Sequence, residues 1–153
     1  METASQQRIK AMLEKLLSEL PPGAAVLRER RTRRDDGTLF ELIPSNHDAA
    51  AILVHVEDRF DLVDFSFGES GTWELPVEGR NRNAGIDGIL SEVEDMCRAV
   101  IAGNCECRQN RFSSVSRIFV DGFACQVRNI LQLSMRTRTT RYLPYHDGLR
   151  IRG

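Results

Sequence analysis

Carboxylates gather beside a histidine in the middle of the chain. His55, Glu57, Asp58, Asp61 and Asp64 fall within a stretch of ten residues, and clustered carboxylates can bind a divalent cation or carry out acid–base catalysis. In a strand, however, alternate side chains face opposite ways, so we expect Asp61 and Asp64 to point to opposite faces. Asp58 is expected to serve a turn. The pattern therefore favours acids on a solvated edge of a sheet over a catalytic carboxylate pair.

The histidines show no spacing typical of a metal or catalytic site. His47, His55 and His146 lie far apart, and His55 shares one face of an expected strand with Leu53 and Glu57. We interpret His55 as a half-buried histidine with a hydrogen-bond partner. The sequence also lacks the nucleophile-elbow, phosphate-loop, dinucleotide-binding and zinc-protease motifs. We predict no catalytic residues, although a triad assembled in space stays open because triads follow geometry rather than sequence position.

The four cysteines are candidate metal ligands. Cys105 and Cys107 would project from one face of a strand, with Cys97 arriving from a helix and Cys125 from a neighbouring strand, and four thiolates suit zinc. No CxxC pair occurs, however, and Cys97 and Cys125 fall on apolar faces typical of buried free cysteines. We therefore predict reduced thiols, no metal and no cofactor.

Two arginine-rich segments are candidate phosphate contacts. They are residues 28–34 (RERRTRR) and residues 136–141 (RTRTTR). In the first segment arginines occur on both faces of an expected strand, and only the second is followed by aromatic residues that could stack on bases, Tyr142 and Tyr145. Arginines on an edge strand also prevent edge-to-edge association of sheets. The sequence favours that role over nucleic-acid binding, which remains an alternative.

Charge is segregated along the chain, although the formal net charge is only −1. Residues 44–78 carry eight acids against Arg59 alone, a net −7, and residues 104–153 carry nine arginines against three acids, a net +6. Such segregation orients partners and speeds their association more than it stabilises a fold. It is the positive feature on which the functional hypothesis rests.

Two amphipathic helices are expected to position these residues. Over residues 5–20 apolar side chains recur every three or four positions, as on a helix packed against a core. Ser5 is the expected N-cap, and Pro21-Pro22-Gly23 ends the helix. A second helix is predicted over residues 86–102, with Gly103 as its C-terminal glycine.

Short strands separated by turn residues are predicted between and after the helices. The strand-like segments before the second helix are residues 24–34, 38–43, 50–57, 60–67 and 72–77. Asp35-Asp36-Gly37 is expected to form a hairpin in which the glycine takes a positive φ. Further strands are expected over residues 104–112, 115–121 and 123–133. The sequence predicts an α+β fold with a mostly antiparallel sheet of about five to eight strands and helices on one face.

Length and composition indicate one globular domain. The chain has 153 residues, of which 41% are hydrophobic, and no apolar run approaches the roughly 18 residues of a membrane helix. We assign residues 1–133 to a single domain and residues 134–153 to a C-terminal tail, docked through Tyr142, Leu143 and Tyr145 or disordered. The polar start METASQQRIK lacks a secretory signal, so we expect a cytoplasmic protein.

We hypothesise a small cytoplasmic binding protein of bacterial type that recognises a macromolecular partner, expected to be a protein, through a charge-segregated surface and performs no chemistry. An acidic sheet region suits a basic partner, such as a toxin to be neutralised or a secreted substrate to be chaperoned. The expected partner-binding residues are acids at strand ends, turns and exposed faces: Glu57, Asp58, Asp61, Glu69 and Glu74. The alternatives are an enzyme or small-ligand site between the second helix and the sheet, and nucleic-acid binding through the arginine segments.

Overall fold

The computed structural model describes residues 3–32, 37–57, 62–76, 85–109, 113–120, 123–129 and 138–147. Within these ranges the chain forms two helices, α1 (Ala4–Glu19) and α2 (Gly85–Ile101). It also forms nine strands: β1 (Ala25–Arg31), β2 (Thr38–Pro44), β3 (Ile52–Glu57), β4 (Leu62–Phe67), β5 (Trp73–Pro76), β6 (Cys105–Gln109), β7 (Ser114–Val120), β8 (Phe123–Asn129) and β9 (Arg138–Arg141). Neither helix has the length and the apolar character needed to cross a membrane.

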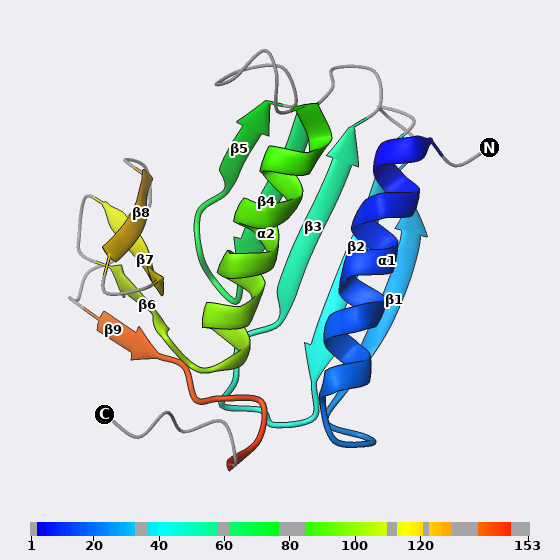
Figure 1. Ribbon diagram of the computed structural model, residues 1–153. Coiled ribbons are helices and arrows are strands. Elements are labelled where there is room, and N and C mark those ends of the chain that lie inside the picture. The colour runs from blue at the N-terminus through cyan, green and yellow to red at the C-terminus, as the bar shows by residue number, and fades with distance from the viewer. Residues whose placement is uncertain are drawn as a thin grey trace.

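The strands form two antiparallel sheets (Figure 1). One sheet has five strands in the order β1-β2-β3-β4-β5, which is the meander that the sequence predicts. The other has four strands in the order β8-β7-β6-β9, so that β9 adds next to β6 and not next to β8. The predicted α+β class with antiparallel strands is confirmed, whereas the division of the strands between two sheets was not foreseen.

Helix α1 begins one residue earlier than its periodicity predicts, because Thr3 and not Ser5 is the N-cap. The Thr3 hydroxyl accepts from the Gln6 backbone N–H, and the Gln6 side chain accepts from the Thr3 N–H. This capping box satisfies two backbone donors that the helix leaves open. The predicted apolar stripe of α1 is buried: Ile9, Met12, Leu13 and Leu16.

Helix α2 packs through the face that the sequence predicts. Ile89, Val93, Met96 and Val100 are buried, and Leu90 lies partly buried against the same core. The helix is followed by Gly103 at a φ of 77°, a left-handed conformation that favours glycine. Because Pro144 N lies 2.7 Å from the position of a Cβ at residue 103, glycine also admits the C-terminal segment at this point.

One face of the five-stranded sheet is covered by helices, and no helix of the described residues lies on the other face. Both helices lie side by side on the same face (Figure 1), and the side chains of β2, β3 and β4 that point toward them are buried: Thr38, Phe40, Leu42, Ile52, Val54, Val56, Val63, Phe65 and Phe67. We call the opposite side the outer face. Its residues alternate with the buried ones and are half-buried or exposed: Arg28, Arg30, Leu39, Glu41, Leu53, His55, Glu57, Leu62, Asp64, Ser66 and Glu74.

The C-terminal segment docks on the rest of the molecule over residues 138–147. Strand β9 pairs with β6, and the Tyr142 ring meets Phe67 edge-on at 5.8 Å between centroids. Tyr145 is buried, and its hydroxyl lies 2.8 Å from the Ala50 carbonyl oxygen and 3.2 Å from that of Leu42. Buried tyrosine hydroxyls need such partners, so Tyr145 holds the segment against the five-stranded sheet.

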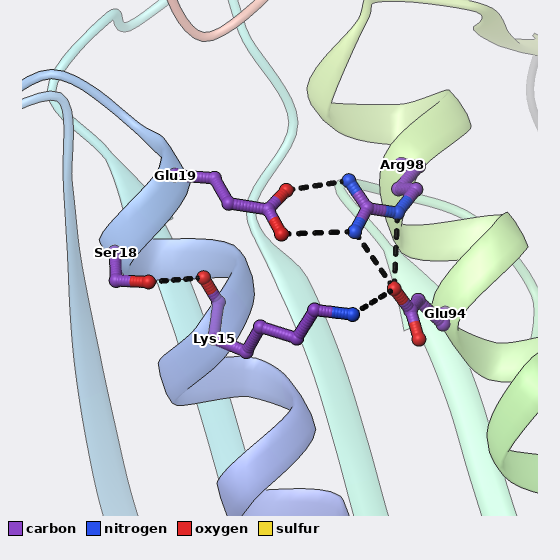
Figure 2. Close-up of polar contacts among 5 residues, drawn as sticks. All are labelled: Lys15, Ser18, Glu19, Glu94 and Arg98. Carbon is purple, nitrogen blue, oxygen red and sulfur yellow. Dashed lines mark hydrogen bonds and ion pairs between the residues drawn. The ribbon is translucent and has the colours of Figure 1, made fainter.

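Ion pairs join the exposed sides of α1 and α2 (Figure 2). The Arg98 guanidinium on α2 donates to both carboxylate oxygens of Glu19 on α1, at 2.6 and 3.1 Å, and to Oε1 of Glu94 at 2.7 Å. Lys15 donates to the same Glu94 oxygen at 3.2 Å. The hydrogen bonds from Arg98 lower the pKa of Glu19 and the pKa of Glu94. Each carboxylate of this network is therefore paired with at least one basic side chain.

Candidate functional site

A row of side chains crosses all five strands on the outer face. The register places Arg30 opposite Leu39, Leu39 opposite His55, His55 opposite Asp64, and Asp64 opposite Glu74. Residues opposite each other on antiparallel strands point to the same face and lie within contact distance. The row thus runs from an arginine on one edge strand to a glutamate on the other, with a histidine and a carboxylate at its centre.

His55, Glu57 and Asp64 form the densest group of titratable side chains on this face. Nδ1 of His55 lies 3.6 Å from Oε1 of Glu57 and 3.7 Å from Oδ2 of Asp64. The three side chains are 18%, 19% and 21% exposed, and their donor atoms lie within 4.8 Å of one another. Within the described ranges this is the one group of three or more histidine, cysteine or acidic ligands arranged so closely.

Alternation along single strands did not predict this group. It compares Asp61 with Asp64 on one strand and places His55 with Glu57 on another, but it does not pair the two strands. The strand alternation itself was right, since Asp64 lies on the opposite face from the buried Val63 and Phe65. The signal that could have found the group is the hairpin register, which sets His55 directly opposite Asp64.

The second nitrogen of His55 is held from the β1–β2 side. Nε2 lies 3.1 Å from the Thr32 hydroxyl oxygen, which agrees with the half-buried, hydrogen-bonded histidine that the sequence predicts. A Cβ at Gly37 would lie 2.7 Å from His55 Nε2 and 2.7 Å from the Val56 carbonyl oxygen. Gly37 has no positive φ, so the turn argument for this residue was wrong: glycine is required by the close approach of the backbone to the histidine ring.

The carboxyl group of Asp64 lies in an unfavourable environment for a negative charge. Burial raises the pKa of Asp64, and the neighbouring negative charge of Glu57 raises this pKa further. One oxygen, Oδ1, is buried and has no hydrogen-bond partner among the described residues. In the same part of the chain His55 is the one ion-pair partner of both Glu57 and Asp64.

The five acids predicted to bind a partner are divided by the fold. Glu57 and Glu74 lie on the outer face, with Glu57 half-buried and Glu74 exposed. Glu69 is exposed in the turn after β4, where its backbone N–H donates to the Tyr142 hydroxyl at 3.0 Å. That turn lies at the opposite end of β4 from Glu57, whose cross-strand partner is Leu62. Asp58 and Asp61 lie outside the described residues.

The cysteines are placed in two kinds of environment. Cys97, Cys105 and Cys107 are buried, and Cys125 on β8 is exposed. Burial raises the pKa of each of the three buried thiols, which disfavours the thiolate that a metal would need. The described cysteines form no group of three or more close ligands.

Arginines gather on the outward side of the four-stranded sheet. Arg117 and Arg141 lie on either side of Glu106, at 3.4 and 3.5 Å from its carboxylate oxygens, and Arg108 shares their face through the strand register. Among the described residues of the two predicted arginine segments, Arg141 alone contributes to this group. Arg28 and Arg30 instead lie on the outer face of the five-stranded sheet, and Arg33 and Arg34 lie outside the described residues.

Comparison with protein-family models, with curated proteins and with solved structures finds no match to this chain.

Proposed function

We propose that this protein is a small cytoplasmic binding protein that recognises a basic protein partner through the acidic half of the outer face. The supporting observation is that this face carries acids without a lysine or arginine partner among the described residues, beside half-buried leucines, whereas the helix-covered face is filled by the core. The acids are Glu57, Asp64 and Glu74. A positively charged partner segment would pair with them and would be steered toward them over a distance of about 8 to 10 Å at physiological salt.

The apolar part of the proposed interface runs beside the acids. Leu39, Leu53 and Leu62 point to the outer face and are only half-buried. Interfaces combine an apolar centre, which excludes water, with a polar and charged rim. A partner that covers the leucines would remove their exposed surface from water and would strengthen the charge contacts around them.

The two edges of the face differ in charge, which gives a partner a preferred orientation. At the β1 edge Arg30 pairs with Glu41 at 2.8 Å, and Arg28 is exposed beside it. At the β5 edge Glu74 is exposed and lies opposite Asp64. A basic segment is therefore repelled at one edge and attracted at the other, and such complementarity specifies register.

The alternative pocket between α2 and the five-stranded sheet receives no support from packing. The residues of α2 that face the sheet, among them Val93 and Met96, belong to the buried core cluster. Nucleic-acid binding is a second candidate because Arg108, Arg117 and Arg141 share one face of the other sheet. Glu106 pairs with two of these arginines, which reduces the positive charge available to phosphates.

The test is a comparison of partners that co-purify with the tagged protein from cells that produce it. Glu74→Lys reverses a charge on the outer face, and Glu14→Lys makes the same change at an exposed site of α1. We expect a basic protein to be retained by the wild type and by Glu14→Lys and to be lost from Glu74→Lys. Its association with the wild type should slow as salt rises, because salt screens the attraction.

A third variant, Glu69→Lys, separates the two ends of the predicted acidic segment. Because Glu69 lies away from the outer-face acids, this variant is expected to retain the partner. Loss with Glu69→Lys and retention with Glu74→Lys would move the interface to the turn after β4. Equal recovery of every partner by all variants would show that the acidic segment does not mediate recognition, and a nucleic acid in the eluate would favour the arginines instead.

A further inference from the structure

We propose that His55, Glu57 and Asp64 bind a first-row divalent metal ion such as Zn²⁺ or Mn²⁺ on the outer face. The donors would be Nδ1 of the histidine, Oε1 of the glutamate and Oδ2 of the aspartate. Imidazole suits zinc and its neighbours in the first transition row, whereas carboxylate oxygen suits manganese and is also common at zinc. A mixed set of one nitrogen and two oxygens therefore favours these ions over the all-oxygen sites of Ca²⁺ and Mg²⁺.

The separations of the donor atoms fit ligands of one ion better than they fit hydrogen bonds. The 3.6 and 3.7 Å separations from His55 Nδ1 to the two carboxylate oxygens exceed the length of an N–H···O hydrogen bond. Ligands about 2.0 to 2.2 Å from a shared ion lie about 3.0 to 3.5 Å from one another. Small movements of the Glu57 and Asp64 side chains, both partly solvent-exposed, would bring the observed separations into the range expected for ligands of one ion.

The surroundings of His55 orient its Nδ1 toward the two carboxylates. When Nδ1 binds a metal, Nε2 carries the proton and donates to the Thr32 hydroxyl, which lies 3.1 Å away. Histidine ligands of metals commonly donate their second N–H in this way, because the contact fixes the ring tautomer and orientation. A Cβ at residue 37 would lie 2.7 Å from the same nitrogen, so glycine at this position leaves room for the ring.

The charge balance of the group also calls for a cation. Two carboxylates face a ring nitrogen, and neither has a lysine or arginine partner among the described residues. The buried Oδ1 of Asp64 lacks a hydrogen-bond partner in the same part of the chain. An ion between the three donors would compensate both charges, and rotation of the Asp64 carboxylate would allow Oδ1 to share in the coordination.

Three protein ligands leave further coordination positions open. The side chains of His55, Glu57 and Asp64 are about one-fifth exposed, so water or a group from outside can complete the coordination shell. Zinc sites with three protein ligands keep an open position of this kind, whereas structural zinc sites are closed by four. The ion would therefore be accessible from solvent and would not be sealed into the fold.

The test is titration of the full chain, freed of metal by a chelator, with MnCl₂ and ZnCl₂. It is done in a Cys125→Ser background, because Cys125 is an exposed thiol that can bind Zn²⁺ by itself. Calorimetry is expected to give one ion per chain. Paramagnetic Mn²⁺ should broaden the ring resonances of His55 and leave those of His47, an exposed histidine elsewhere on the surface, sharp.

Variants of the donors decide between a built site and unspecific attraction of cations. Glu57→Gln and Asp64→Asn are each expected to weaken Mn²⁺ and Zn²⁺ binding by at least about tenfold. Glu74→Gln removes the same charge from a neighbouring residue that is not a proposed metal ligand. The affinity of this variant for Mn²⁺ and Zn²⁺ should stay within about threefold of that of the wild type. Circular dichroism of each variant checks that the fold is retained.

Two outcomes would overturn the proposal. One is the absence of saturable binding of either ion up to millimolar concentration. The other is an equal loss of affinity in Glu74→Gln and Asp64→Asn, which would show only a diffuse attraction of cations to an acidic face. No partner protein enters these measurements, so their result is independent of the co-purification test.

Discussion

Two groups of charged side chains on opposite sides of this molecule are built on different principles. On the helix side, Arg98 joins Glu19 and Glu94, and Lys15 joins Glu94 as well (Figure 2). On the outer face of the five-stranded sheet, His55 is the one partner of two carboxylates within the described residues. The helix-side acids have a lowered pKa, whereas Asp64 has a raised one.

The difference in charge compensation distinguishes a structural contact from the site that we propose on the outer face. Paired charges between helices hold the helices in register and need nothing more. Half-buried acids that face each other cost free energy in the absence of a cation, and such arrangements are concentrated at functional sites. The comparison supports our proposal that the outer face binds a ligand or partner, whereas the ion pairs on the helix side stabilise the fold.

The largest loss of stability is expected from a variant that breaks the packing beneath the helix-side network. Val93→Asp places a charge among buried apolar residues, and an unpaired buried charge costs several kcal/mol, comparable to the whole stability of a small domain. We expect the variant to be unfolded, as measured by circular dichroism and thermal melting. Ser91→Asp, the same change at an exposed position of α2, should melt within a few degrees of the wild type. A folded Val93→Asp protein would mean that this face of α2 is not part of the core.

A smaller effect is expected from removing the central cation of the network. Arg98→Met deprives Glu19 and Glu94 of their main partner and should lower the melting temperature at pH 7 by about 2 to 4 °C. Because Arg98 lowers the pKa of both glutamates, its contribution is present above the ordinary glutamate pKa near 4.5 and is lost as the pH falls through the lowered values. The melting temperatures of variant and wild type should therefore converge on acidification.

A matched variant sharpens this prediction. Arg8→Met breaks a single ion pair between the same two helices, with Asp87, and isolated surface pairs contribute little. We expect Arg8→Met to lower the melting temperature by less than Arg98→Met does. An equal decrease in melting temperature in both variants would show that joining Arg98 to two glutamates adds no stability beyond that of a single ion pair.

The smallest effect has the opposite sign and comes from the outer face. Asp64→Asn in metal-free protein removes a charge that burial, Glu57 and Glu74 all disfavour and only His55 favours. We expect a gain of about 0.5 kcal/mol at pH 7, or 1 to 2 °C in melting temperature. The raised pKa means that ionised Asp64 destabilises the fold above that pKa and that acid relieves the penalty, so the gain should shrink as the pH falls. A loss of stability at pH 7 would show that Asp64 stabilises the fold, as the charged residues on the helix side do.

Local sequence patterns determined which segments form which elements. Apolar residues three and four apart predicted both helices to within one residue, because a helix packed on a core must present one continuous apolar stripe. Strand-like segments bounded by turn residues predicted β2, β3 and β4. Alternation along each strand predicted which side chains share a face, since a strand exposes successive side chains to opposite sides. Short turns between strands then require neighbouring strands to pair, which gives the antiparallel meander.

Tertiary structure alone decided what those elements bring together. His55 and Asp64 meet because of one particular register between β3 and β4, and a shift by a single residue would turn each to the other face. The hydroxyl of Tyr145 joins the carbonyls of Leu42 and Ala50, about one hundred positions earlier in the chain. Strand β9 lies beside β6, about thirty positions earlier, and not beside β8. Such contacts depend on the packing of the whole chain, because no local propensity encodes which distant surface a segment will cover.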